Sequence, residues 1–277
     1  MAFKNNLFST LTVIYLLIVC LISPHTSFGQ LDVVRIIDQS IDESKKEAIL
    51  ILPGFGDSKK GRKNQTKFFD NKGYDLFIPV YINETSLEKC VEDYFQFYVK
   101  DSLSKYKKIH VFSYIIGSWT INNYINTYGV KNVATIVYDR SPIQERAPYI
   151  VNRYLTRIGK FKFGPVLKDL AETSYPVIKK DSIHIGILIE SKATKIMRLY
   201  RKKTLKMGVL NWHVDSLYQP YDDYCYTWLN HDQMYNRFDV IGEEVLSFIK
   251  TGQFTVEAKR ERYNWNPFKS YRKEGLK

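Results

Sequence analysis

Short apolar runs that alternate with helical segments constrain the fold of this 277-residue chain more than any other feature of its sequence. Residues 47–52 and 182–190 are almost continuously apolar, which is typical of strands buried on both faces. The segment after Ser86 instead repeats apolar side chains at helical spacing. Further strands are expected at residues 32–38, 74–82, around Ile109 and Val111, at 133–138 and at 224–229, and a closing helix within 231–254. This alternation predicts an α/β fold with a mostly parallel sheet covered by helices on both faces.

The first 29 residues have the anatomy of a secretory signal peptide. Lys4 gives a positive start, residues 7–22 form an apolar run, and the small residues Ser27 and Gly29 follow at cleavage-site spacing. We therefore expect a secreted, periplasmic or cell-envelope protein. The alternative is an uncleaved membrane anchor formed by residues 7–22, because the run approaches the length of a short membrane span.

Residues 30–254 are expected to form one domain, since 44% apolar and 15% aromatic residues suffice for a substantial core. Residues 143–180, approximately, are rich in aromatic and basic side chains and lack strand alternation, so they are interpreted as an inserted helical lid. Residues 255–277 form a basic, aromatic tail that we expect to be loosely ordered. Cys90 and Cys225 remain after the leader, and a disulfide or two buried thiols are both compatible with export.

The segment KKIHVFSYIIGSWTINNYINTYG, residues 107–129, predicts a short buried strand, a tight turn and a helix. Its turn resembles the nucleophile elbow of the α/β-hydrolases, whose pattern is Gly-x-Ser-x-Gly. In that alignment Ser113 replaces the first glycine, Ile115 replaces the serine, and Gly117 is the second glycine. The resemblance implies the α/β-hydrolase fold for residues 45–253, approximately. An isoleucine has no nucleophilic atom, so Ser113 and Ser118 are the candidates for a displaced nucleophile.

Two further motifs carry the resemblance. The turn LPGFGD at residues 52–57 is similar to the oxyanion-hole turn of the family, which implies that the backbone N–H groups of Phe55 and Ile116 face a developing oxyanion. His231 follows the last predicted strand and precedes the terminal helix, where the family places its general base.

The acid partner of that histidine is expected to be lost. The family pattern places it at residue 193 or 194, which are alanine and threonine here. Glu190 lies a few residues early, and acids later in the chain could reach His231 by another route: Asp215, Asp222 and Asp223.

The chain carries a formal net charge of +12, which favours partners with anionic surfaces. One basic cluster has near-helical spacing and predicts a surface that binds anionic lipid; it contains Lys195, Arg198, Lys202 and Lys206. Nucleic acid is not an expected partner of an exported chain. No cofactor is expected, and no metal site is expected because no ligand pair has helical or hairpin spacing.

The leading hypothesis is an exported α/β-hydrolase-like pseudoenzyme that binds a ligand or partner without catalysis. Its basic, aromatic lid suits an amphiphilic or anionic small molecule. The alternative hypothesis is a carboxylic ester hydrolase of the esterase or lipase type, in which Ser113 or Ser118 acts with His231.

Overall fold

The computed structural model describes residues 31–179 and 182–269. The predicted signal peptide and the alternative anchor at residues 7–22 lie outside this part of the chain. Within the described residues, no helix is both long enough and apolar enough to cross a bilayer.

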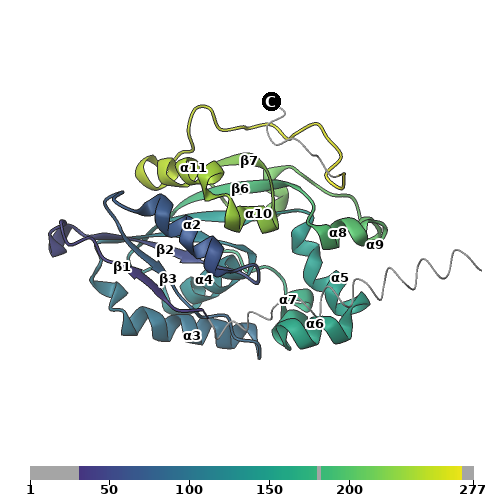
Figure 1. Ribbon diagram of the computed structural model, residues 1–277, viewed down its shortest axis with the longest axis horizontal. Helices are drawn as coiled ribbons and strands as arrows, with labels where there is room; N and C mark the ends of the chain where they lie inside the picture. The colour runs from purple at the N-terminus through teal and green to yellow at the C-terminus, as the bar shows by residue number, and fades with distance from the viewer. Residues whose placement is uncertain (1–30, 180–181, 270–277) are drawn as a thin grey trace, which may run out of the picture.

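A seven-stranded sheet forms the centre of the molecule, with the strand order β1-β3-β2-β4-β5-β6-β7 (Figure 1). The strands are β1 (Val34–Ile36), β2 (Glu47–Leu52), β3 (Asp75–Ile78), β4 (Lys108–Ser113), β5 (Val133–Arg140), β6 (His184–Lys192) and β7 (Asp223–Asn230). All neighbouring strands are parallel except β1, which pairs antiparallel with β3 at one edge. The predicted α/β class with a mostly parallel sheet is confirmed.

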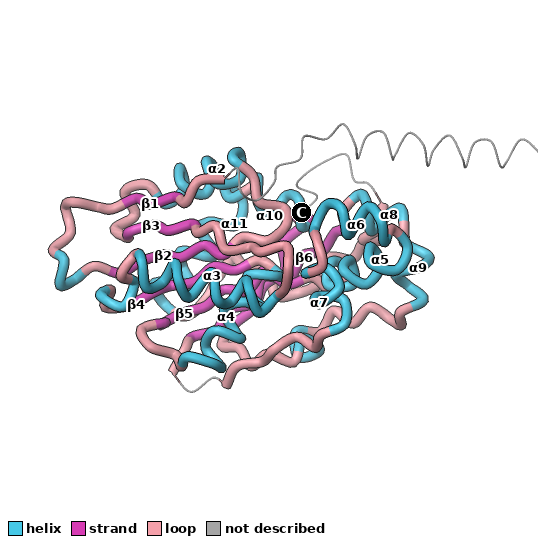
Figure 2. The backbone as a smooth tube through the Cα atoms, turned by 90° about the horizontal axis from the view of Figure 1, so that it is seen from below, coloured by secondary structure: helices cyan, strands magenta, loops and turns pink. Residues whose placement is uncertain are grey.

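Helices cover both faces of the sheet (Figures 1 and 2). One face carries α2 (Lys59–Phe69), α10 (His231–Asn236) and α11 (Phe238–Thr251), and the other carries α3 (Leu87–Lys100) and α4 (Ile115–Tyr128). The remaining helices are α5 (Ala147–Tyr154), α6 (Thr156–Phe163), α7 (Val166–Glu172), α8 (Lys195–Leu199) and α9 (Arg201–Lys206). Short 3₁₀ turns lie at η2 (Glu43–Lys45), η3 (Leu103–Lys105), η4 (Gln144–Arg146) and η5 (Val214–Leu217).

Strand β2 shows why its sequence is continuously apolar. Ile49 and Ile51 pack into the core under α2 and α11, while Leu50 and Leu52 pack into the core under α3 and α4. Successive side chains of a strand point to opposite faces, so a strand covered on both sides needs apolar residues at every position.

Helix α2 was not expected from the sequence. Its buried residues are Gly61, Arg62, Gln65 and Phe69, so it has no continuous apolar stripe. Arg62 holds the helix in place instead: its guanidinium forms an ion pair with Asp57 at 2.6 Å and donates to the backbone oxygens of residues 32, 78 and 79. The buried cation is therefore paired and its hydrogen-bonding capacity is used, as burial of a charge requires.

Three boundaries differ from the sequence expectations. The strand expected at 74–82 ends at Ile78, before Pro79, and the edge strand expected at 32–38 is only three residues long. The closing helix is divided at Arg237 into α10 and α11. Cys90 and Cys225 are both buried and free, so they do not form a disulfide.

The tail is not loosely ordered over its described part, residues 255–269, which corrects the expectation above. The backbone N–H of Tyr226 on the edge strand β7 donates to the carbonyl of Lys259 at 2.8 Å. Further along, the Trp265 indole donates to the carbonyl of Ser191, and the N–H of Ala193 donates to the carbonyl of Pro267. The tail thus runs along β7 and contacts the loop that follows β6.

Candidate functional site

The turn between β7 and α10 fixes His231 at the carboxyl end of the sheet. Asn230 caps the helix: its side chain accepts from the N–H of Gln233 at 3.0 Å, and the Gln233 side chain accepts from the N–H of Asn230 at 3.1 Å. This capping box satisfies two N–H groups that the helix itself leaves unpaired. The backbone that carries His231 is thereby fixed, and 11% of the side chain is exposed.

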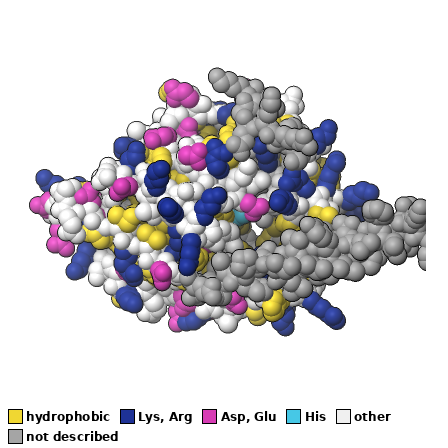
Figure 3. All heavy atoms as spheres, viewed as in Figure 1, with side chains coloured by type: hydrophobic (Ala, Val, Ile, Leu, Met, Phe, Trp, Pro, Cys, Tyr) yellow, Lys and Arg dark blue, Asp and Glu magenta, His cyan; other side chains and the backbone are white. Residues whose placement is uncertain are grey.

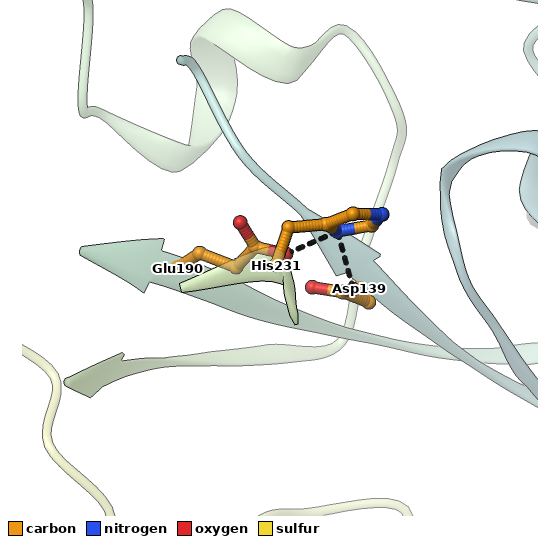
Figure 4. Close-up of side chains that lie close together, drawn as sticks. All are labelled: Asp139, Glu190 and His231. Carbon is orange, nitrogen blue, oxygen red and sulfur yellow. Dashed lines mark hydrogen bonds and ion pairs between the residues drawn. The ribbon is translucent and has the colours of Figure 1, made fainter. Parts of the chain in front are cut away.

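Two buried carboxylates meet this imidazole from the neighbouring strands (Figure 4). Glu190 on β6 lies with Oε1 2.6 Å from Nδ1 of His231, and Asp139 on β5 lies with Oδ2 3.3 Å from the same nitrogen. Both carboxylate side chains are fully buried. The second ring nitrogen points away from both carboxylates in Figure 4. The three side chains therefore form a compact acid–base cluster at adjacent strand ends.

The electrostatics of this cluster favour a protonated imidazole. Burial alone would lower the pKa of His231, but the negative charges of Glu190 and Asp139 and the hydrogen bond to Glu190 outweigh it, so the pKa is raised well above its ordinary value. Burial and the adjacent charge of Asp139 raise the pKa of Glu190 well above its ordinary value, although His231 opposes the shift.

The expectation that His231 lacks an acid partner is wrong. Glu190 is that partner, and Asp139 lies beside it. The later acids have other roles: Asp215 accepts from Tyr221, Asp222 accepts from the N–H of Ile185, and Asp223 pairs with Arg260. Residues 193 and 194 both lie beyond β6.

From the sequence, Glu190 was named only as an acid that lies a few residues early, and Asp139 was not named. Each is an acid at the end of an apolar run, and the carboxyl ends of adjacent parallel strands meet at one edge of the sheet.

The elbow turn is formed by Tyr114, which lies between the end of β4 and the start of α4. Gly117 is required there, because a β-carbon at this position would lie 2.3 Å from the backbone oxygen of Leu52. Ile115 is the first residue of α4 and is only partly buried. It is not among the non-glycine residues with positive φ, so it lacks the left-handed backbone that strains such a turn.

Ser113 and Ser118, the candidates for a displaced nucleophile, are both fully buried. Their hydroxyl oxygens are 2.8 Å apart and share a hydrogen bond, and the Ser118 hydroxyl also lies 3.0 Å from the carbonyl of Tyr114. The hydroxyls thus join the end of β4 to the first turn of α4. This geometry counts against a nucleophilic role for either serine, since a nucleophile must reach both its base and the substrate.

The turn compared with an oxyanion hole packs against Tyr235 of α10. The Tyr235 hydroxyl accepts from the N–H of Gly54 at 3.0 Å, and β-carbons at Gly54 or Gly56 would lie 2.6 Å from the tyrosine side chain. Its ring stacks on Tyr114 with centroids 3.8 Å apart and meets His231 edge-on at 5.4 Å. Burial raises the pKa of Tyr235, so its hydroxyl remains protonated. Sequence reasoning missed this tyrosine, because nothing in its spacing from His231 distinguishes it from a core aromatic.

The N–H groups of Phe55 and Ile116 remain predicted oxyanion donors. The ring of Phe55 also contacts the ring of Phe163 in α6, with the two centroids 4.7 Å apart. The segment expected to form a lid thus reaches the glycine-rich turn. Helices α5, α6 and α7 all belong to this segment, between β5 and β6.

A metal ion fits the cluster poorly, although ligand atoms of Asp139, Glu190 and His231 lie within 4.8 Å of one another. Ligands of one tetrahedral zinc ion are about 3.3 Å apart when the bonds are about 2.0–2.1 Å long. The 2.6 Å separation of Nδ1 and the Glu190 oxygen is a hydrogen bond and is too short for two ligands of one ion. The donor set therefore acts as an acid–base cluster in this arrangement.

The four basic residues expected to bind anionic lipid do not share one continuous helix. Lys195 and Arg198 lie on α8, whereas Lys202 and Lys206 lie on α9, because the helix is interrupted at Tyr200. The cluster around His231 consists instead of Asp139 and Glu190 with that histidine, and α8 and α9 lie to the right of α10 in Figure 1.

Comparison with solved structures identifies the fold. The juvenile hormone epoxide hydrolase of the silkworm Bombyx mori matches 79% of this chain and 73% of its own, with 10% identity and a TM-score of 0.54. A probable hydrolytic enzyme from Pseudomonas aeruginosa matches 79% and 89%, with 12% identity and a TM-score of 0.53. A Bacillus licheniformis lipase in its mature form matches 80% and 98%, with 11% identity and a TM-score of 0.53.

No protein-family model and no curated protein matches the sequence. At such low identities the solved structures establish the fold alone. The chain has the α/β-hydrolase fold, as the residues around Gly117 and His231 predicted.

Proposed function

We propose that this α/β-hydrolase-fold protein is exported and binds a ligand or partner at the carboxyl end of its sheet, without forming an acyl-enzyme intermediate. The observation that carries the proposal is the residue at the elbow. Ile115 stands where the fold's pattern has serine, and it begins α4 with an ordinary helical backbone. A hydrocarbon side chain supplies no attacking atom.

The surroundings of the elbow also support a role without an acyl-enzyme intermediate. The two nearest serines, Ser113 and Ser118, are buried and their hydroxyls share a hydrogen bond. The Tyr235 hydroxyl already accepts from the N–H of Gly54 in the glycine-rich turn. The hydroxyls of Ser113 and Ser118 and the N–H of Gly54 are thus engaged within the protein.

The proposed ligand is amphiphilic or anionic. The lid segment presents exposed aromatic and basic side chains, among them Tyr154, Phe161 and Arg157. The basic side chains of the lid, and not the His231 cluster, would supply positive charge for an anionic group, because two buried carboxylates already pair with His231. The proposal of export rests on the sequence of residues 1–29.

Ester hydrolysis is the second candidate, and the acid–base cluster favours it. A histidine hydrogen-bonded to a buried carboxylate has the geometry of the histidine–acid pair of a catalytic triad, and it would act as a base above its raised pKa. Hydrolases also occur among the solved structures with this fold.

A fluorophosphonate probe distinguishes the two candidates. We expect no labelling of the wild-type protein and no turnover of short-chain nitrophenyl esters. Ile115→Ser restores a hydroxyl beside an intact acid–base pair, and labelling of that variant, abolished by His231→Asn, would show that the pair remains competent. Labelling of the wild type that disappears in Ser113→Ala or Ser118→Ala would overturn the proposal and establish a displaced nucleophile.

Ligand binding is measured separately, by the shift in melting temperature with a series of saturated fatty acids. Ile115→Trp tests whether the ligand lies over the elbow, with Val256→Trp as the control at a residue that is 95% exposed. A fatty-acid shift that survives Ile115→Trp would place binding elsewhere.

A further inference from the structure

Two helical segments at one end of the molecule contain no acidic residue. Residues 147–163, which form α5 and α6, carry four basic side chains, and residues 195–209, which include α8 and α9, carry six. The chain as a whole has 41 basic and 29 acidic residues, so ten basic residues without an acid are a strong local bias. We call these two segments together the basic end.

The two segments lie side by side, although they are distant in sequence. Lys203 lies 4.8 Å from the centroid of the Tyr154 ring, and the rings of Tyr154 and Tyr200 are 6.2 Å apart. Arg146, just before α5, donates to the carbonyls of Thr204 and Gly208 at 2.8 Å. Figures 1 and 2 show α5, α6, α8 and α9 grouped at the same end in both views.

The basic end also exposes apolar side chains. Seven of the thirteen large apolar side chains that are exposed in the described chain belong to these two segments, which make up a small share of its length. Val209 is 91% exposed and Leu199 is 55% exposed. Figure 3 shows basic and acidic side chains together at the left of the face that it presents, the side opposite α8 and α9 in the same view of Figure 1.

We propose that the basic end docks on a bilayer that contains anionic phospholipid. Lysine and arginine side chains are attracted to the anionic headgroups, while exposed aliphatic side chains enter the boundary between headgroups and acyl chains. Apolar groups favour this partner over nucleic acid, because a phosphate backbone offers them no apolar environment. The surface extends the predicted set of Lys195, Arg198, Lys202 and Lys206 to the lid, and it does not depend on what the His231 site binds.

Binding to vesicles tests the charge requirement. The full chain is titrated with phosphatidylcholine vesicles and with vesicles that contain 30 mol% phosphatidylglycerol, and the ratio of the two partition coefficients isolates the contribution of charge. Each basic residue near an anionic surface strengthens binding about fivefold. Replacing Arg157, Lys160, Lys202 and Lys206 by Gln should therefore reduce the ratio by several hundredfold, on the order of four such factors.

A matched control uses four exposed lysines of α2, which lies outside the basic end. The variant K59Q/K60Q/K63Q/K67Q removes the same charge and should leave the ratio within about fivefold of the wild type, the effect of one residue. An equal reduction of the partition-coefficient ratio in the two quadruple variants would overturn the proposal, since it would show that net charge alone attracts the protein to the vesicles. All eight residues are exposed, so both variants are expected to fold, which melting curves verify.

A fluorescent probe tests the apolar part. An environment-sensitive dye is attached at Val209→Cys or, as a control, at Val256→Cys, in a Cys20→Ser background. Both valines are more than 90% exposed, and the two remaining cysteines are buried. Anionic vesicles should shift the emission of the dye at 209 to the blue and leave the dye at 256 unchanged. Tight binding to random-sequence duplex DNA together with no shift at 209 would refute membrane docking.

Discussion

Replacement of Glu190 by glutamine tests the acid–base cluster most directly. In the wild type, two buried carboxylates surround one imidazole, so the cluster carries one excess negative charge when all three groups are ionised. Glutamine removes that excess, keeps an oxygen that can accept from Nδ1 of His231, and leaves Asp139 3.3 Å from the same nitrogen.

The expected cost of E190Q is therefore moderate. A hydrogen bond to a charged group is worth about 1.5–3 kcal/mol, but relief of the repulsion between Glu190 and Asp139 offsets part of it. We expect a loss of about 1–2 kcal/mol in unfolding free energy at pH 5. The double variant D139N/E190Q leaves a buried imidazolium without a counter-charge and should lose about 3–5 kcal/mol at that pH. The double loss should exceed the sum of the single losses, because either carboxylate can serve when the other is absent.

The pH dependence has a definite sign. The pKa values of both Glu190 and His231 are raised in the folded protein, so it holds protons that the unfolded chain releases. The stability that the cluster contributes is complete below the unfolded pKa of the glutamate, about 4.3, and is lost as the pH rises through the raised values. E190Q removes the glutamate and lowers the pKa of His231, so its stability should fall less steeply with pH. The loss of unfolding free energy that E190Q causes relative to the wild type should therefore shrink between pH 5 and pH 8.

Denaturation in urea at pH 5, 6.5 and 8, followed by tryptophan fluorescence, measures these differences. Long-range ¹H–¹⁵N correlation spectra follow the imidazole, with His231→Asn for assignment. Two outcomes would refute the proposed sharing of the imidazole between two carboxylates. One is that E190Q lowers the unfolding free energy as much as the double variant does, and the other is that the effect of E190Q grows toward pH 8.

Three further substitutions test other parts of the structure, each by urea denaturation. Gly117→Ala should cost at least about 3 kcal/mol, because its β-carbon would lie 2.3 Å from the backbone oxygen of Leu52; a loss below about 1 kcal/mol would contradict the close packing of the elbow. Arg62→Met leaves a buried carboxylate unpaired and should cost about 3–5 kcal/mol, and a neutral outcome would mean that the pair does not anchor α2. Tyr235→Phe leaves the N–H of Gly54 without its acceptor and should cost about 1–3 kcal/mol, whereas an unchanged stability would show that this N–H finds another partner.

The sequence predicted the elements whose side chains repeat with a clear period. Strands β2 and β7 and helix α3 were located closely, because a strand covered on both faces is continuously apolar and Ser86 is a strong helix cap. Gly117 and His231 were placed correctly for a related reason, since both lie at turns where strand and helix patterns meet.

Glu190 was not assigned as the acid partner, and Asp139 was missed, because charged residues were taken as the ends of strands. Strand β5 continues past Tyr138 to Arg140, and β6 continues past Glu190 to Lys192. Pairing with neighbouring strands keeps these residues in the sheet, although their own character does not favour burial. A bulge between β6 and β7 near Glu190 adds a local displacement that residue spacing alone does not reveal.

Helix α2 was missed because its sequence lacks a clear apolar period. Its buried face consists of glycine, arginine and glutamine as well as phenylalanine, so it has little apolar periodicity to detect. Its position depends on the pairing of Arg62 with Asp57 and with backbone oxygens brought together only by folding.

The C-terminal tail has a practical consequence for work with this protein. An unpaired edge strand is a template on which other molecules can add strands, and proteins commonly cover such edges to prevent it. On that edge, the N–H of Tyr226 donates a hydrogen bond to the carbonyl of Lys259. Truncation after Phe254 would expose β7 and should produce concentration-dependent self-association, so expressed fragments are best extended through at least residue 269.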